Sequence, residues 1–277
     1  MIALSCVVIL ATYAVLIETW RRMVVAWGEE LSFGDAAHIW FVSSLARYLP
    51  GVNQIFTLGA VAELSRRRHV SAVAAAGASV INTAMNIASG FVIALLAGFS
   101  ALNVMSSGHA TLGIWVAAVL LAGLLLLPTV LPWVLGTAQR VTGRQFGIGA
   151  LPQHAMNISL VGNLVAWLMY GLAFQYFVRG VLGHEVGSTL DYVALWAAAY
   201  VIGYLVVLLP AGIGAREAAL VTGLTTLSLA TFGEAGVIAI SARLWLTVLE
   251  IVPALIYLAR GARPRPQDTI PRDGSIP

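Results

Sequence analysis

The fold is decided by two breaks, LPG at Leu49–Gly51 and LPAGIG at Leu209–Gly214, each inside an otherwise apolar segment. The two segments run from about residue 36 to 65 and from about residue 190 to 231. Proline removes a backbone N–H donor from a helix, and glycine permits the chain to reverse. Each segment is therefore predicted to be a helical hairpin. Because the arms on either side of Pro50 are short for full spans, a re-entrant hairpin is favoured over two crossings.

The composition is that of a membrane protein. Of the 277 residues, 60% are hydrophobic and only 10% are charged, and the mean hydropathy is +0.90. A soluble domain carries about 25% charged residues, so a soluble enzyme or a nucleic-acid binder is excluded. The single cysteine, Cys6, and the scattered histidines predict neither a disulfide nor a metal site, and no cofactor is expected. Catalytic motifs are absent from the sequence, so an enzyme is not expected.

Five further apolar runs are long enough to cross about 30 Å of hydrocarbon. They lie at roughly residues 3–20, 71–98, 112–135, 156–179 and 236–259.

All 15 basic residues are arginine, and arginine collects in cytoplasmic loops. If each broken segment returns to the membrane face from which it enters, Arg179 is the only loop arginine on the non-cytoplasmic face, and Arg47, Arg216 and Arg243 lie inside membrane segments. The cytoplasmic arginines are then Arg21, Arg22, Arg66, Arg67, Arg68, Arg140, Arg144, Arg260, Arg263, Arg265 and Arg272. This pattern predicts a multi-pass protein of a bacterial inner membrane, with a cytoplasmic C-terminus.

The order of features recurs along the chain. In both halves a helix ends at an arginine, a short acidic loop follows, and a broken apolar segment comes next. Three crossings separate the two copies, and an odd number places the second copy upside down. The prediction is an all-α helical bundle in one transmembrane domain, residues 1–260. It contains an inverted repeat of about 1–135 and about 156–260, whose hairpin tips meet near the midplane. A disordered cytoplasmic tail is expected at 261–277.

Arg47 and Arg216 lie close to the two breaks, where a charge inside the membrane is costly. One interpretation is that each pairs with a nearby carboxylate such as Glu217 or extends to an interface. The other is that they bind an anion, because glycine-rich breaks expose backbone N–H groups and arginine adds a bidentate partner. The residues of the breaks that would allow close backbone approach are Pro50, Gly51, Pro210, Gly212 and Gly214.

Two membrane helices carry inward-facing polar stripes. The helix at 71–98 includes Asn82 and Asn86, which could line a substrate site or form interhelical hydrogen bonds. The helix at 236–259 includes Arg243 and Glu250 on one face. These two residues are two turns, about 10 Å, apart, so each needs a partner on another element or a water molecule.

The second break resembles the signature of a flippase-like membrane family, typified by the membrane region of lysylphosphatidylglycerol synthases. The motif is LPAGIGAREAAL at Leu209–Leu220. ARYLPG at Ala46–Gly51 is similar to the upstream motif of that family, and Arg243 matches its late membrane arginine. The resemblance covers nearly the whole chain and implies a protein that moves a lipid between leaflets. Asn82 and Asn86 depart from the family pattern, in which many members carry a charged pair, and the family usually has one more helix at the start.

The sequence therefore predicts a transporter for an anionic phospholipid or a polyprenyl-phosphate-linked glycolipid. The expected partner is a membrane lipid with a phosphate headgroup, and nucleic acid is not expected. The alternative is a non-transporting scaffold or accessory subunit for a membrane glycosyltransferase or lipid-modifying enzyme. The oligomeric state stays open. The predicted substrate-binding residues are Arg47, Pro50, Gly51, Asn82, Asn86, Pro210, Gly212, Gly214, Arg216, Glu217, Arg243 and Glu250.

Overall fold

The computed structural model describes residues 1–48, 54–103, 152–184, 187–205 and 214–261, with scattered residues between 115 and 140. The elements in these ranges are helical, which confirms the predicted all-α class. In chain order they are α1 (Ile2–Ala26), α2 (Phe33–Ser44), the 3-10 helix η1 (Leu45–Tyr48), α3 (Gln54–Arg66), α4 (Ala72–Asn103), α6 (Gln153–Leu182), α7 (Thr189–Leu205), α8 (Ala215–Thr226) and α9 (Phe232–Gly261).

Among the described residues, four helical segments are long and apolar enough to cross a membrane. They are Ile2–Ala26, Ala72–Leu96, Gln153–Leu182 and Phe232–Arg260, and they match four of the five predicted spans. Part of the fifth, at 112–135, lies outside the described residues, and a shorter apolar helix runs at Leu121–Val130. The tail predicted at 261–277 also lies outside them, apart from the last residue of α9.

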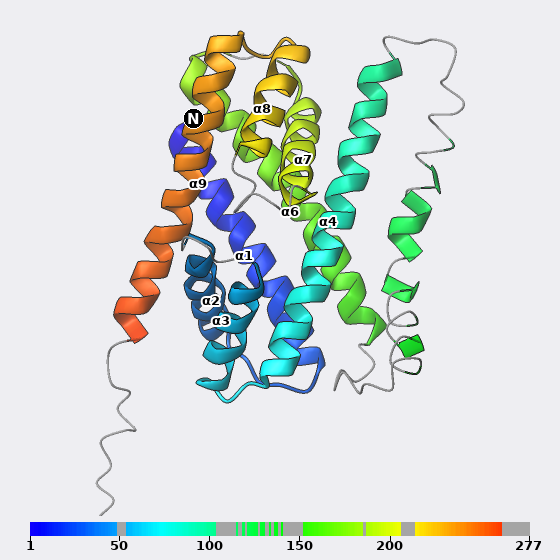
Figure 1. Ribbon diagram of the computed structural model, residues 1–277, viewed down its shortest axis with the longest axis vertical. Helices are drawn as coiled ribbons and strands as arrows, with labels where there is room; N and C mark the ends of the chain where they lie inside the picture. Colours follow the sequence, from blue (N-terminus) through cyan, green and yellow to red (C-terminus); the bar gives the residue numbers. More distant parts are fainter. Residues whose placement is uncertain are drawn as a thin grey trace, which may run out of the picture.

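The helices form a bundle around α1 and α6, which pack together and run in opposite directions (Figure 1). The blue helices α2 and α3 occupy the lower half of the view, and α7 and α8 occupy the upper half. α4 runs upward on one side of the bundle and α9 runs downward on the other. The short helices of each pair lie against each other, and each pair also packs against both α4 and α9.

The packing of the helices α1–α4 on one another has the same order as the packing of α6–α9. α1 packs on α2 as α6 packs on α7, α2 on α3 as α7 on α8, and α3 on α4 as α8 on α9. The contacts between the two sets also correspond, because α2 packs on α9 and α7 packs on α4. Exchanging α1–α4 with α6–α9 therefore reproduces the packing of these helices.

The starts of α2 and α7 are built in the same way. At the start of α2, the Asp35 N–H donates to the Ser32 side chain at 3.1 Å. At the start of α7, the Asp191 N–H donates to the Ser188 side chain at 3.3 Å. A side-chain oxygen at this position satisfies an N–H group that the first helical turn leaves without an intrahelical acceptor. The Ser-x-x-Asp pattern thus fixes where both helices begin.

The ends of α3 and α8 also correspond. Each helix is followed by a non-glycine residue in the left-handed region, His69 with φ 60° and Ser228 with φ 54°. The next amide, of Val70 or Leu229, donates to the carbonyl five residues earlier, at 3.0 and 2.9 Å respectively. Both of these apolar side chains are buried. This is the Schellman arrangement, which satisfies carbonyl groups at a helix end and turns the chain sharply.

Glycine at position 171 sets the distance between α6 and α7. A Cβ atom at Gly171 would lie 2.3 Å from the Cα atom of Val193 in α7. Because that neighbour is backbone, no rotation of a side chain could relieve the contact. The absence of a side chain at Gly171 therefore lets α7 approach α6 closely, and α7 carries Trp196 and Tyr200, two of the aromatic residues of the site described below.

Gly171→Ala is predicted to destabilise the protein by roughly 1–3 kcal/mol, the usual cost of overpacking a close contact. The matched control is Gly236→Ala in α9, where nothing lies within 4 Å of the added Cβ atom. The control should be neutral or stabilising by up to about 1 kcal/mol, because alanine favours a helix. Thermal unfolding of the detergent-solubilised variants measures both. Equal melting temperatures for the two variants would contradict this account of the α6–α7 contact.

Candidate functional site

The structure places the three predicted intramembrane arginines on three different elements. Arg47 lies in η1, Arg216 in the first turn of α8, and Arg243 in the middle of α9. Pro50, Gly51, Pro210 and Gly212, which were predicted to shape the site, lie outside the described residues.

Arg47 forms an ion pair with Glu250 of α9, with Nη1 3.4 Å from Oε1. Glu250 is only 6% exposed and accepts two further hydrogen bonds. The Tyr48 hydroxyl donates to Oε2 at 2.6 Å, and the Tyr13 hydroxyl donates to Oε1 at 3.4 Å. A buried carboxylate needs such donors, because its desolvation is otherwise uncompensated. Glu250 thus joins η1, α1 and α9.

Arg243 forms an ion pair with Glu217 of α8, with Nη1 2.5 Å from Oε1. The other oxygen of Glu217 accepts the Gly214 N–H at 2.7 Å, so the carboxylate also caps the start of α8. Gly214 has φ +88°, a left-handed conformation that favours glycine. The Gly214 N–H, predicted as a contact for an anion, is therefore engaged by Glu217 in this structure.

Arg216 is held by aromatic rings. Its guanidinium carbon lies 4.5 Å from the centroid of Trp196 and 5.0 Å from that of Tyr200, both on α7. Within the described part of the chain, neither the buried Nη2 of Arg216 nor the buried Nε1 of Trp196 has a hydrogen-bond partner. Both atoms are donors, so any group that satisfies them must be an acceptor.

The two broken segments share the aromatic face of α7. Tyr200 lies beneath Arg216, and it is also close enough to Arg47 for an electrostatic interaction. The ring centroids of Tyr200 and Tyr204, one turn apart, are separated by 5.3 Å. Tyr200 thus contacts Arg216 through its ring and contributes to the electrostatic surroundings of Arg47, which comes from the other half of the chain.

The described site carries one more positive than negative charge. Its charged residues are the three arginines together with Glu217 and Glu250. Three arginines and two glutamates leave a net charge of plus one. Because the two carboxylates are bound to Arg243 and Arg47, this positive charge lies on Arg216.

Asn82 and Asn86 point to α6 rather than to the arginines. The Asn86 amide donates to Asn163 Oδ1 at 2.8 Å, and Asn163 donates to Asn82 Oδ1 at 3.0 Å. Ser159 donates to the same Asn82 oxygen at 2.9 Å. Of the two interpretations of this stripe, the geometry favours interhelical hydrogen bonding between α4 and α6.

The aromatic residues of the site were not predicted from the sequence. They are Tyr13, Tyr48, Trp196 and Tyr200. Trp196 and Tyr200 are four residues apart and so lie on one face of a helix, which is the only local signal of their shared role. Tyr48 follows Arg47 directly, whereas Tyr13 reaches Glu250 from 237 residues away in sequence.

Comparison of the chain with models of protein families, with curated proteins and with solved structures found no match. The resemblance to the flippase-like family therefore stays a prediction based on the two breaks and Arg243.

Arg47→Ala is predicted to lower the free energy of unfolding by roughly 1–3 kcal/mol, because it leaves the buried Glu250 carboxylate without its cation. Adding Glu250→Gln should restore most of the loss, since a neutral amide oxygen still accepts from Tyr48 and Tyr13. Thermal unfolding in detergent measures the coupling between the two changes.

The matched control for this cycle is Arg67→Ala, which removes the exposed pair of Arg67 with Glu63 at 2.9 Å. Exposed pairs contribute only about 0–1 kcal/mol, so the control should unfold close to the wild type. Strictly additive effects of Arg47→Ala and Glu250→Gln would contradict the pairing.

Proposed function

We propose that the protein is a lipid flippase-like membrane transporter that moves a lipid with an anionic phosphate headgroup between leaflets. The substrate class is an anionic phospholipid or a polyprenyl-phosphate-linked glycolipid. The observation that carries this proposal is Arg216, a cation within the bundle whose described neighbours are aromatic rings and not carboxylates.

The charge on Arg216 gives the reason to expect an anionic ligand. A charged side chain at the centre of a membrane costs at least about 2.5–3.5 kcal/mol on insertion scales, and such residues mark substrate pathways. Glu217, the carboxylate next to it in sequence, is already engaged by Arg243 and by the start of α8. A phosphate oxygen is the natural acceptor for the free donor of Arg216, because the guanidinium fork matches its geometry.

Helix lengths support re-entrant hairpins as the frame of the site. Within the described residues, α2, α3, α7 and α8 contain 12, 13, 17 and 12 residues. At 1.5 Å per residue such helices extend about 18–26 Å, less than the roughly 30 Å of hydrocarbon. Two short helices that enter from one face and return to it would place their tips inside the membrane, where the three arginines are expected.

The repeated packing supports an inverted-topology repeat. The neighbours of α1–α4 and α6–α9 correspond, the caps of α2 and α7 correspond, and so do the ends of α3 and α8. α1 and α6 run in opposite directions, as do α4 and α9 (Figure 1). In transporters built this way, rocking one repeat against the other exposes a central site to each side in turn.

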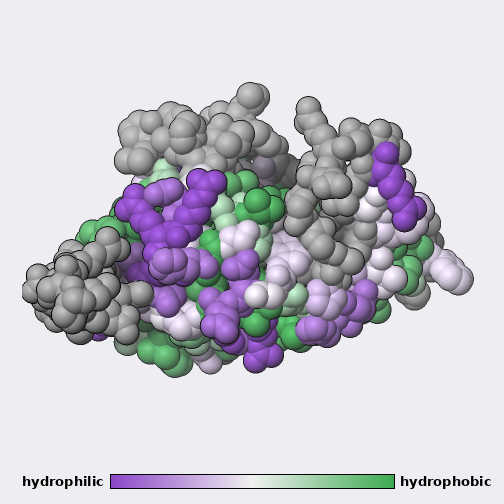
Figure 2. Space-filling view, turned by 90° about the horizontal axis from the view of Figure 1, so that it is seen from below, coloured by the Kyte–Doolittle hydropathy of each residue, from purple (hydrophilic) through white to green (hydrophobic). Residues whose placement is uncertain are grey.

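Charge placement supports a cytoplasmic lower face. The lower ends of α1 and α3 in Figure 1 carry Arg21, Arg22 and Arg66, and hydrophilic side chains gather on that end of the molecule (Figure 2). Arg179 lies near the upper end of α6. By the positive-inside rule, the proposed location is a bacterial inner membrane with the lower end in the cytoplasm.

In the proposed cycle, the headgroup phosphate binds Arg216 while the hydrocarbon chains stay in lipid. Arg47, with Nη1 3.4 Å from Oε1 of Glu250, stays paired and is the second cation near the breaks, so it adds to the positive potential that attracts the phosphate. Shielding the phosphate charge lowers the cost of crossing the apolar interior.

Arg216→Ala is predicted to reduce transport at least about tenfold, because the charge-assisted bonds to the phosphate are lost. The assay is movement of a fluorescent phosphatidylglycerol in proteoliposomes. The melting temperature should fall less than it does for Arg47→Ala, because only the ring contacts with Trp196 and Tyr200 are lost and no described carboxylate loses its partner. Arg216→Lys should recover only part of the activity, since lysine keeps the charge but lacks the fork. Arg67→Ala serves as the control and should transport as the wild type does.

Two results would contradict this function. In the first, Arg216→Ala lowers the melting temperature, Glu217→Gln restores it, and transport is unaffected in the double variant. In the second, the wild-type protein moves no labelled anionic lipid and co-purifies stoichiometrically with a membrane enzyme, which would favour the scaffold.

A further inference from the structure

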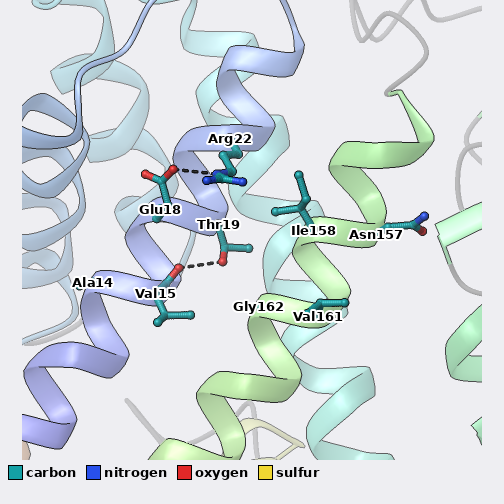
Figure 3. Close-up of a pocket in the computed structure, with 9 residues that line it drawn as sticks. All are labelled: Ala14, Val15, Glu18, Thr19, Arg22, Asn157, Ile158, Val161 and Gly162. Atoms are coloured by element: carbon teal, nitrogen blue, oxygen red, sulfur yellow. Dashed lines mark hydrogen bonds and ion pairs between the residues drawn. The ribbon is translucent and has the colours of Figure 1, made fainter.

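A groove with a volume of about 630 Å³ opens on the outer surface between α1 and α6. Figure 3 shows its lining, with Glu18 and Arg22 at one end and Val15, Val161 and Gly162 further along. The groove is separate from the arginine site, because none of Arg47, Arg216 and Arg243 lines it. We propose that it binds one anionic phospholipid, with the headgroup at Arg22 and an acyl chain along the apolar walls.

The charges around the polar end of the groove sum to plus one when Arg21, which lies outside the lining but binds Glu18, is counted with Glu18 and Arg22. Glu18 accepts hydrogen bonds from Arg21 at 2.7 and 2.8 Å and from Arg22 at 2.7 Å. One carboxylate thus serves two arginines, and one positive charge is left over. The Arg22 side chain is 54% exposed, and Asn157 lies on the facing wall. The Asn157 amide points away from Arg22 (Figure 3) and accepts from Gln153 at 3.3 Å, so the exposed Arg22 guanidinium is the group that complements a phosphate.

The rest of the groove is apolar and offers no polar group that needs a partner. The Thr19 hydroxyl donates to the Val15 carbonyl at 2.7 Å, so it is already satisfied. α1 and α6 meet at the floor, where a Cβ atom at Gly162 would lie 2.2 Å from Thr19 Oγ1. Ala14 and Gly162 leave the groove open where larger side chains would fill it. Such a surface suits a hydrocarbon chain.

The polar and apolar ends of the groove lie at the membrane depths where a lipid places its headgroup and its acyl chain. α1 ends at Ala26 in the lower part of Figure 1, and Arg22 is four residues before that end. Ala14 lies eight residues earlier, about 12 Å toward the interior at 1.5 Å per residue. The charge is therefore at headgroup depth and the apolar part extends inward from it. A second copy of this chain fits less well, because a symmetric contact there would bring two Arg22 side chains together. The inference holds whether or not the protein transports lipid.

The test is native mass spectrometry of the delipidated full chain in detergent, titrated with palmitoyl-oleoyl phosphatidylglycerol. The first lipid should bind more tightly than those that follow. Arg22→Gln should weaken this first step about tenfold, the effect of one lost charge-assisted hydrogen bond. The matched control is Arg67→Gln, which removes another exposed arginine that pairs with a glutamate four residues earlier, and it should leave the first step unchanged.

A second pair of variants tests the apolar part. Val161→Trp fills the groove and should abolish the tight first step. Val237→Trp places the same side chain on α9, where the valine is 60% exposed compared with 59% at Val161, and it should bind as the wild type does. Equal binding by Arg22→Gln and Arg67→Gln, or by the two tryptophan variants, would overturn the proposal. It would also be overturned if Val161→Trp abolished a dimer seen in the wild type.

Discussion

The structure depends on how charges are matched inside an apolar bundle. Three arginines lie on elements that the sequence places within the membrane, and two carboxylates are available to them. Each carboxylate binds one arginine and also joins separate elements: Glu250 links η1, α1 and α9, and Glu217 links the start of α8 to α9. Arg216 is left on the aromatic face of α7. The same two ion pairs that hold the helices together therefore leave one cation available for a ligand.

The close approach of α6 and α7 is what brings that aromatic face into place. Gly171 lets the backbone of α7 lie against α6, and Trp196 and Tyr200 then project from α7 toward Arg216. About two turns before Gly171 on α6, Asn163 is hydrogen-bonded to the two asparagines of α4. α6 is thus held by α7 at one point of its length and by α4 at another, which suits a rigid element against which hairpins could move.

The long helices could be predicted from the sequence because an apolar run of membrane-spanning length has few other stable arrangements. The presence of intramembrane arginines was also visible, because each lies near a break or within a span. Their partners were not, since Arg47 and Glu250 are 203 residues apart and meet only once η1 packs on α9. The positions of Asn82 and Asn86 on an inward face were predicted, but only the structure distinguishes a contact with α6 from a place in the arginine site. Which side chains pair across helices depends on tertiary packing, and the periodicity of polar residues along one helix does not contain that information.

The most direct test of the central claim, that Arg216 is an intramembrane anion site, is a cryo-electron microscopy structure in nanodiscs containing phosphatidylglycerol. The account predicts headgroup density within hydrogen-bond distance of the Arg216 guanidinium, with Glu217 still bound to Arg243 and the rings of Trp196 and Tyr200 beneath the arginine. A map in which Arg216 donates to a carboxylate or backbone carbonyl of the chain, with no lipid density beside it, would contradict the account.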